Sequence, residues 1–370
     1  MKNRVKMIST SGLILAILVM LLTGCAGNDT AGQKAGGTDS GKLSVAATLF
    51  PYYDFVRQVA GDRVDLKLVV PAGMDSHSFE PTPADMLTIQ NADVIISNGG
   101  ALEHWLSQVL EAIDTSDMTI MVGMDYVDTV QEEIVEGMED EEHDHDHAGE
   151  SHGVKETHDA AVTGGKEEPH AGELSPYDGT DGLNTADDGQ GVEIEYDEHI
   201  WTSPVNAMTL VAEIASVLSD ADPENADYYE ANKEAYLEKL AHLDGEFREV
   251  VSKEKRNLIV VGDKFPFRYL ADEYGLAYRA AFSGCSTDTE PSAKTIAYLI
   301  DKIRAEKIPV VYYLELSSHR VSEIISEETG AEPLLLHSCH NVTRRQFDEG
   351  VTYLELMEQN VINLRKGLDE

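Results

Sequence analysis

Strand-like and helix-like segments alternate along this chain, and that alternation limits its possible folds more than any other feature of the sequence. Apolar, β-rich runs in the first part cover residues 43–49, 64–70, 94–97 and 119–122, with helical patterns between them at 52–60, 83–91 and 103–113. After residue 256 the pattern resumes, with strands predicted at 258–262, 309–314 and 334–337 and helices at 267–274, 292–306, 319–329 and 351–364. Such alternation predicts an α/β fold of two lobes, each a parallel sheet flanked by helices.

A helical pattern of unusual length separates the two blocks. Pro223 and Glu224 suit a helix start, and apolar side chains then recur at steps of three and four residues as far as Val250. At 1.5 Å per residue, a helix from Glu224 to Ser252 would span roughly 44 Å. We therefore expect a linker helix within residues 223–255 to join the lobes, although an ordinary surface helix would show the same periodicity. The expected N-terminal and C-terminal lobes are residues 42–222 and 256–370.

The N-terminal segment has the pattern of a bacterial lipoprotein signal. A basic start precedes an apolar run from Gly12 to Leu22, which is too short to span a bilayer comfortably. The run ends in Leu22-Thr23-Gly24-Cys25, which resembles a lipobox, where the cysteine is acylated and the preceding residues are removed. Alternatives are a plain secretory signal or an uncleaved anchor helix. We expect a signal peptide over 1–24, a flexible tether over 25–41, and lipid anchoring through Cys25 on the extracytoplasmic face of the cell membrane.

The charge of the chain restricts its partners. The formal net charge is −40, which argues against nucleic acid because phosphate binding needs lysine and arginine. Residues 131–200 alone hold 23 acidic residues against two lysines. A charge of this sign fits cations as partners. The 346 residues that begin at Cys25 are enough for two domains of ordinary size.

Residues 131–197 interrupt the α/β pattern without any apolar periodicity, and we predict a disordered acidic loop inserted into the first lobe. The loop carries six histidines within 28 residues, namely His143, His145, His147, His152, His158 and His170. Imidazole beside carboxylate suits Zn²⁺, so we expect low-affinity metal capture here. High affinity is not expected, because a flexible loop must lose entropy to close around an ion. The alternative is a solvated acidic loop with incidental histidines.

Two short motifs outside the loop each place a histidine at a strand-to-helix junction. The first is Pro71-Ala72-Gly73-Met74-Asp75-Ser76-His77-Ser78-Phe79-Glu80-Pro81, directly after a predicted strand. The second is His199-Ile200-Trp201-Thr202-Ser203-Pro204, which opens a helix. Ligands of α/β folds gather at such junctions. A lone histidine is more often structural than a ligand, but the two motifs together indicate a binding site.

The residues around His77 and His199, together with Asn98-Gly99-Gly100-Ala101-Leu102-Glu103-His104-Trp105-Leu106 and Glu290-Pro291-Ser292, resemble the zinc/manganese solute-binding receptors of ABC importers, the ZnuA type. The resemblance runs from Leu43 to the C-terminus, with the histidine-rich insertion in the family's usual place. It implies two α/β lobes joined by a long helix, a metal ion in the cleft, and ABC permease and ATPase subunits as partners. It also implies that His77 and His199 are ligands.

Two ligand positions depart from the family's pattern. Where the family has a histidine or glutamate, this chain has Lys264, whose ammonium group has no free lone pair, so its neighbour Asp263 is the predicted substitute. Where the family has a carboxylate after the last strand, this chain has His340. A set of His77, His199, Asp263 and His340 would be a reasonable closed zinc site. Imidazole-rich ligation favours Zn²⁺ over Mn²⁺.

The remaining cysteines, Cys285 and Cys339, lie in loops that we expect to face the cleft. In an exported protein such a pair most often forms a disulfide, and the alternatives are metal-binding thiolates or two free buried thiols. No nucleophile elbow and no His-Glu-x-x-His motif occurs, so we do not expect an enzyme. The other functional alternative is a surface metal sink or a metal-dependent adhesin with the same fold and no transporter.

Overall fold

The computed structural model describes residues 41–138, 186–187, 193–194, 196–284 and 291–369. The described residues form one compact unit. Several sequence predictions lie outside the described residues: the signal peptide, the lipid-anchored Cys25, the tether up to residue 40, and the six loop histidines. Within the described ranges, no helix combines the length and the apolar character that crossing a membrane requires.

The first sheet is parallel throughout and has the strand order β2-β1-β3-β4. Its strands are β1 (Leu43–Ala47), β2 (Val64–Leu68), β3 (Val94–Ser97) and β4 (Thr119–Val122). Central strands of such a sheet are covered on both faces, and they accordingly read as continuous apolar runs. All four residues of β3 are buried. Two of the predicted strands end two residues earlier than expected, and the sheet itself is confirmed.

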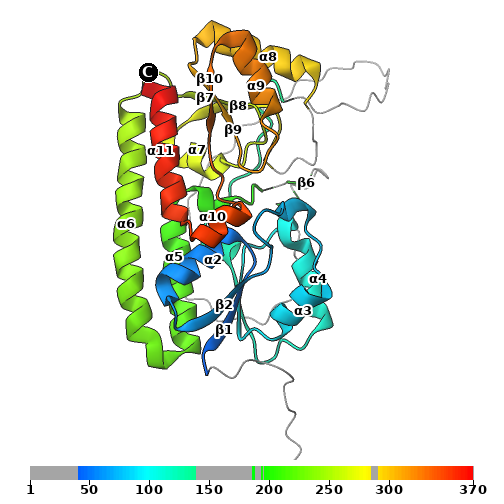
Figure 1. The fold of residues 1–370 in the computed structure, drawn as a ribbon, viewed down its shortest axis with the longest axis vertical. Helices are drawn as coiled ribbons and strands as arrows, with labels where there is room; N and C mark the ends of the chain where they lie inside the picture. The colour runs from blue at the N-terminus through cyan, green and yellow to red at the C-terminus, as the bar shows by residue number, and fades with distance from the viewer. Residues whose placement is uncertain (1–40, 139–185, 188–192, 195, 285–290, 370) are drawn as a thin grey trace, which may run out of the picture. The chain divides into compact units, whose positions relative to one another are not determined.

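Helices cover both faces of the first sheet (Figure 1). They are α2 (Phe50–Ala60), α3 (Pro83–Gln90), α4 (His104–Ala112) and α5 (Pro204–Ala221). Proline stands in the first turn of α2, α3 and α5, where its missing N–H costs nothing. The Ser203 side chain caps α5 by accepting hydrogen bonds from the backbone N–H groups of Val205 and Asn206.

The second sheet is also parallel, with the order β10-β9-β7-β8. Its strands are β7 (Leu258–Val261), β8 (Ala277–Ala280), β9 (Val310–Tyr313) and β10 (Glu332–Leu335). Its helices are α7 (Arg268–Tyr274), α8 (Ala293–Glu306), α9 (Arg320–Thr329) and α10 (Arg344–Glu349). Side chains alternate between faces: Val260 and Val311 pack with α8 and α9, while Val261 and Tyr312 point into the main core.

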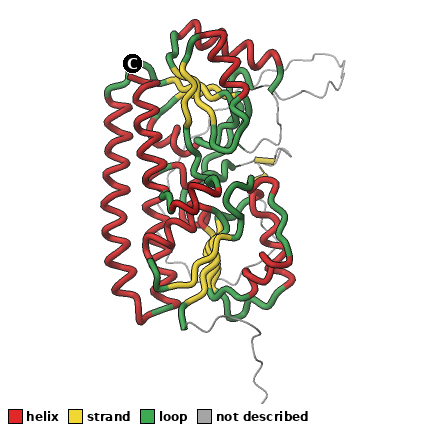
Figure 2. The backbone as a smooth tube through the Cα atoms, viewed as in Figure 1, coloured by secondary structure: helices red, strands yellow, loops and turns green. Residues whose placement is uncertain are grey.

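Two long helices run beside both sheets, as the ribbon and the tube show (Figures 1 and 2). They are α6 (Ala226–Ser252), which joins the lobes, and α11 (Tyr353–Asp369), which packs on α6 and on α2. The long joining helix predicted from periodicity is therefore confirmed, with its first turn formed instead by the 3₁₀ segment Pro223–Asn225. One hydrophobic cluster includes residues from both lobes, from Val45 to Leu368.

Candidate metal centre

His77 lies in a single 3₁₀ turn, η1 (Ser76–Ser78), on the loop after β2. Asp75 precedes this turn, and its Oδ1 accepts a hydrogen bond from the His77 backbone N–H at 3.2 Å. The loop is also bound to the second lobe, because Asn341 Nδ2 donates to two of its carbonyl oxygens at 2.9 and 2.8 Å. These bonds place the His77 imidazole beside residues that follow the second sheet.

His199 is fully buried at the start of the 3₁₀ turn η4 (Ile200–Thr202), just before α5. Asp197 Oδ1 accepts a hydrogen bond from the His199 backbone N–H at 2.8 Å and lies 3.2 Å from the ring nitrogen Nδ1. A carboxylate at Nδ1 favours the tautomer with the proton on that nitrogen, which leaves Nε2 free to bind an ion. Asp197 is a member of the site that was not predicted from the sequence, although it stands only two residues before the predicted ligand.

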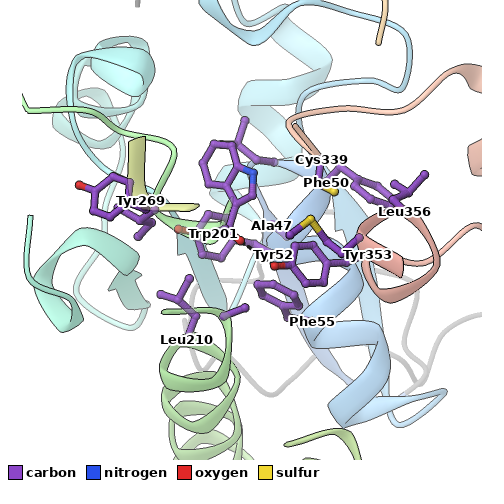
Figure 3. Packing of buried hydrophobic residues seen from close by; sticks show 14 of the residues in the cluster. Ala47, Phe50, Tyr52, Phe55, Trp201, Leu210, Tyr269, Cys339, Tyr353 and Leu356 are labelled. Carbon is purple, nitrogen blue, oxygen red and sulfur yellow. Dashed lines mark hydrogen bonds between the residues drawn. The ribbon is translucent and has the colours of Figure 1, made fainter. Parts of the chain in front are cut away.

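His340 lies in the loop between β10 and α10, at the carboxyl edge of the second sheet. Its ring lies 5.4 Å from that of Trp201, whose Nε1 donates to the Ser338 carbonyl oxygen at 2.8 Å. Trp201 is completely buried with Tyr52, Phe55 and Tyr353 (Figure 3). Ser76 Oγ and His340 Nε2 are hydrogen-bonded across the cleft. The indole and the serine hydroxyl therefore position this imidazole from the first lobe.

The three imidazoles meet in one cavity between the lobes. Their ring centroids are 5.7 Å apart for His77 and His199, 5.1 Å for His77 and His340, and 5.3 Å for His199 and His340. One ring nitrogen of each lies within 4.8 Å of the others. Among the described residues, this is the group of histidine, cysteine and carboxylate side chains that is arranged to hold a metal ion. The cavity measures about 190 Å³.

The protonation of the cluster is set by burial and by neighbouring charges. Burial, followed by the nearby charges of His199 and Lys264, lowers the pKa of His77 to about 3. Burial likewise lowers the pKa of His340, with His77, His199 and Lys264 acting in the same direction. For His199, burial favours the neutral ring, but the charge and hydrogen bond of Asp197, together with the charges of Glu198 and Glu132, raise the pKa. Two of the imidazoles are therefore neutral at pH 7, which is the form that binds metal ions.

Asp263 and Lys264 line the same cavity, at the carboxyl end of β7. Asp263 Oδ1 accepts from the Lys264 backbone N–H at 2.9 Å and Oδ2 from the Leu314 N–H at 3.4 Å. The carboxylate does not belong to the group formed by the three histidines. It would have to give up these hydrogen bonds to reach an ion, and its role as the fourth ligand stays a prediction.

Cys339 is buried in the core and is a free thiol among the described residues, with its pKa raised by burial. Cys285 lies outside the described residues, so the predicted disulfide stays a prediction. His337 is also buried, and its Nδ1 accepts a hydrogen bond from the Cys339 backbone N–H at 2.9 Å. His337 does not belong to the three-histidine group, and this bond gives its ring a structural role in the loop.

Two buried glutamates support the site from the first lobe. Glu198 Oε2 accepts from the Leu102 N–H at 2.7 Å, and Oε1 accepts from the Ala101 N–H. Glu103 Oε2 accepts from the Asn98 and Gly99 N–H groups at 2.8 and 2.9 Å. Burial raises the pKa of each carboxyl to about 7. The Glu198 bonds attach the segment that carries His199 to the loop after β3, and the Glu103 bonds hold that loop together.

Two parallel α/β lobes with three imidazoles at their junction define a two-lobed protein with a candidate metal site in the cleft. Residues 45–367 match the family model described as the periplasmic zinc-uptake complex component A, ZnuA. This match covers most of the chain, and the chain therefore belongs to the ZnuA family.

Known proteins resemble this chain in sequence and in fold. The chain is 29% identical over 359 residues to the zinc-binding lipoprotein AdcA of Streptococcus pneumoniae, covering 97% of this chain but only 60% of AdcA. It is 29% identical over 360 residues to the high-affinity zinc uptake system protein ZnuA of Bacillus subtilis, covering 97% of both chains. The Zn(II)-bound ZnuA-like domain of Streptococcus pneumoniae AdcA superposes with a TM-score of 0.63 at 27% identity, covering 89% of this chain and 100% of that domain.

Proposed function

We propose that this protein is an extracytoplasmic receptor that captures Zn²⁺ in its inter-lobe cleft and delivers the ion to an ABC importer. The observation that carries the proposal is the group formed by His77, His199 and His340, which joins both lobes around one cavity. Membership of the ZnuA family and the names of the relatives, which describe zinc binding and zinc uptake, support the choice of ion and the role.

The chemistry of the donors favours Zn²⁺ over Mn²⁺. Imidazole is a borderline-soft ligand that suits Zn²⁺, whereas Mn²⁺ prefers carboxylate oxygens. The three imidazoles come from three separate loops, so an ion bound to all of them would hold the lobes together. We propose a binding role without catalysis. The expected proton release on binding comes from His199, whose pKa the Asp197 carboxylate raises.

Delivery would depend on the parts of the chain outside the described residues. We propose that Cys25 carries a lipid anchor, that residues 25–41 tether the body to the membrane, and that the histidine-rich loop raises the local concentration of cations. The partners would be the permease and ATPase of the importer. A metal sink or an adhesin with this fold would lack such partners, and zinc uptake by cells that lack only this protein distinguishes the cases.

The site is tested by zinc titration against a chromophoric competitor, using the mature protein and single variants. His77→Ala and His199→Ala should each weaken zinc binding by at least a hundredfold, while far-ultraviolet circular dichroism stays unchanged. His242→Ala is the matched control, because this exposed histidine lies on α6 away from the cleft. Wild-type affinity in either cleft variant would refute the proposed site. Metal analysis of protein purified without chelator then identifies the native ion.

Deletion of residues 139–169 separates the loop from the cleft. The shortened protein should keep one tight zinc site and bind fewer ions in total, because the loop histidines are expected to bind weakly. Loss of the tight site along with the loop would show that the three clustered imidazoles are insufficient on their own.

A further inference from the structure

Lys264 brings a positive charge to the three-histidine cavity. The residue follows β7 directly, is half-buried, and lines the cavity together with His77, His199 and His340. Within the described ranges, no carboxylate forms an ion pair with its side chain. A cation in a cavity that fits a metal ion is not explained by the binding function alone.

The lining carboxylates are occupied by other hydrogen bonds. Asp263 accepts from two backbone N–H groups. Glu315 Oε2 accepts from the Ser338 backbone N–H at 2.8 Å, and its Oε1 accepts from the Ser338 hydroxyl. Asp75 accepts from the His77 backbone N–H at 3.2 Å. The lining carboxylates are thus engaged by loop groups, and among the described residues none of them forms an ion pair with Lys264.

Lys264 and the three imidazoles line one cavity of about 190 Å³, so an ion held by the imidazoles lies close to this lysine. A positive charge in the wall of a small cavity repels a cation inside it. The Coulomb energy scales with the charge of the ion, so a divalent ion meets twice the repulsion of a monovalent ion.

We propose that Lys264 is a specificity-determining residue of this site: its ammonium group weakens binding of divalent ions more than binding of monovalent ions by the same three imidazoles. The inference rests on the metal site proposed above. The consequence is a moderated hold on Zn²⁺ by the three imidazoles. An ion held in this way would leave the cleft faster than one enclosed by four protein ligands.

The test compares Zn²⁺ with Ag⁺, a monovalent ion that also binds imidazole, in nitrate buffer with the full mature protein. Lys264→Gln should tighten Zn²⁺ binding roughly tenfold or more and Ag⁺ binding about threefold, because the change in log affinity follows the ion's charge. Lys264→Arg, which keeps the charge, should stay within about twofold of wild type for both ions. Lys239→Gln, at an exposed position on α6, is the charge-matched control and should change neither affinity.

Three results would overturn the inference. Equal changes for Zn²⁺ and Ag⁺ would point to a packing effect instead of a charge effect. Weaker Zn²⁺ binding by Lys264→Gln would indicate that a neutral lysine amine is itself a ligand. Unchanged affinity for both ions would show that the ammonium group is screened from the cavity. In each case His199→Ala decides separately whether the ion sits at the imidazoles, so failure of this inference is distinguishable from failure of the proposed function.

Discussion

Glu103 gives a stability test that is independent of metal binding. Its side chain is buried, and burial followed by the neighbouring charge of Glu198 raises the pKa from 4.5 to about 7. A carboxyl that binds its proton more tightly in the folded state destabilises the fold as the pH rises between these two values. At pH 8 the cost is about 3 kcal/mol, and at pH 5 it is about 1 kcal/mol, since the native carboxyl is then protonated.

Glu103→Gln removes this pH-dependent cost while keeping the shape of the side chain. The glutamine carbonyl oxygen can accept the two backbone hydrogen bonds that Glu103 Oε2 accepts now. The new amide group replaces Oε1, which has no hydrogen-bond partner among the described residues, and any cost of burying it does not vary with pH. The variant should therefore gain about 2 kcal/mol relative to wild type between pH 5 and pH 8.

Urea denaturation of the metal-free protein, with chelator present, measures this difference at pH 5, 6, 7 and 8. Glu111→Gln is the control, because it removes an exposed carboxylate from α4, the helix that begins directly after Glu103. The control should show the pH dependence of wild type. If the curves of Glu103→Gln and wild type ran parallel within about 0.5 kcal/mol, the raised pKa of Glu103 and the reasoning from burial would be refuted.

Three other perturbations address the lobe interface and the cleft. Asp54→Ala should lower the free energy of unfolding by about 3 kcal/mol, because Arg57 and the Tyr353 backbone N–H lose a buried acceptor. A loss of stability under about 1 kcal/mol in thermal denaturation would contradict this prediction. Asp197→Asn should weaken zinc binding by about tenfold to a hundredfold in competition titrations, and an unchanged affinity would show that the carboxylate does not orient His199. Zinc binding at pH 6 should release about one proton, because His199 is the one imidazole of the three with a raised pKa. Calorimetry in buffers of different ionisation enthalpy measures this number, and release of two or more protons would contradict the neutral state of His77 and His340.

Most strands of the two sheets could be predicted from their apolar runs. Val94–Ser97 matches its predicted bounds because a central parallel strand buried on both faces must be apolar throughout. Thr119–Val122 also matches: it is an edge strand, but its last three residues are an apolar run. Ala277–Ala280 is an edge strand too, and it was missed because an arginine interrupts its short sequence, Ala-Tyr-Arg-Ala. Helix α10 was also missed, although Thr343 and Gln346 form a capping box that marks its start.

Some residues of the candidate metal site could be predicted from local sequence patterns, and others depend on how the lobes meet. His77 and His199 stand at strand-to-helix junctions, which a local pattern can reveal. The place of His340 beside them depends on how the second sheet meets the first, and only the resemblance to the family suggested it. The pairing of Asp197 with His199 was invisible in the sequence, because an aspartate near a histidine contacts its ring only in particular backbone conformations.

The start of helix α11 makes the two lobes inseparable during folding. Its first residue, Tyr353, donates its backbone N–H to Asp54 at 2.7 Å across 299 residues of sequence, and its ring packs 4.9 Å from that of Phe55. Contacts so distant in sequence form late, because the chain must first close a long loop. The first lobe therefore cannot complete its core until the last part of the chain is present. A product truncated before residue 353 would expose the surface around Phe55, and proteolysis would distinguish it from the finished protein.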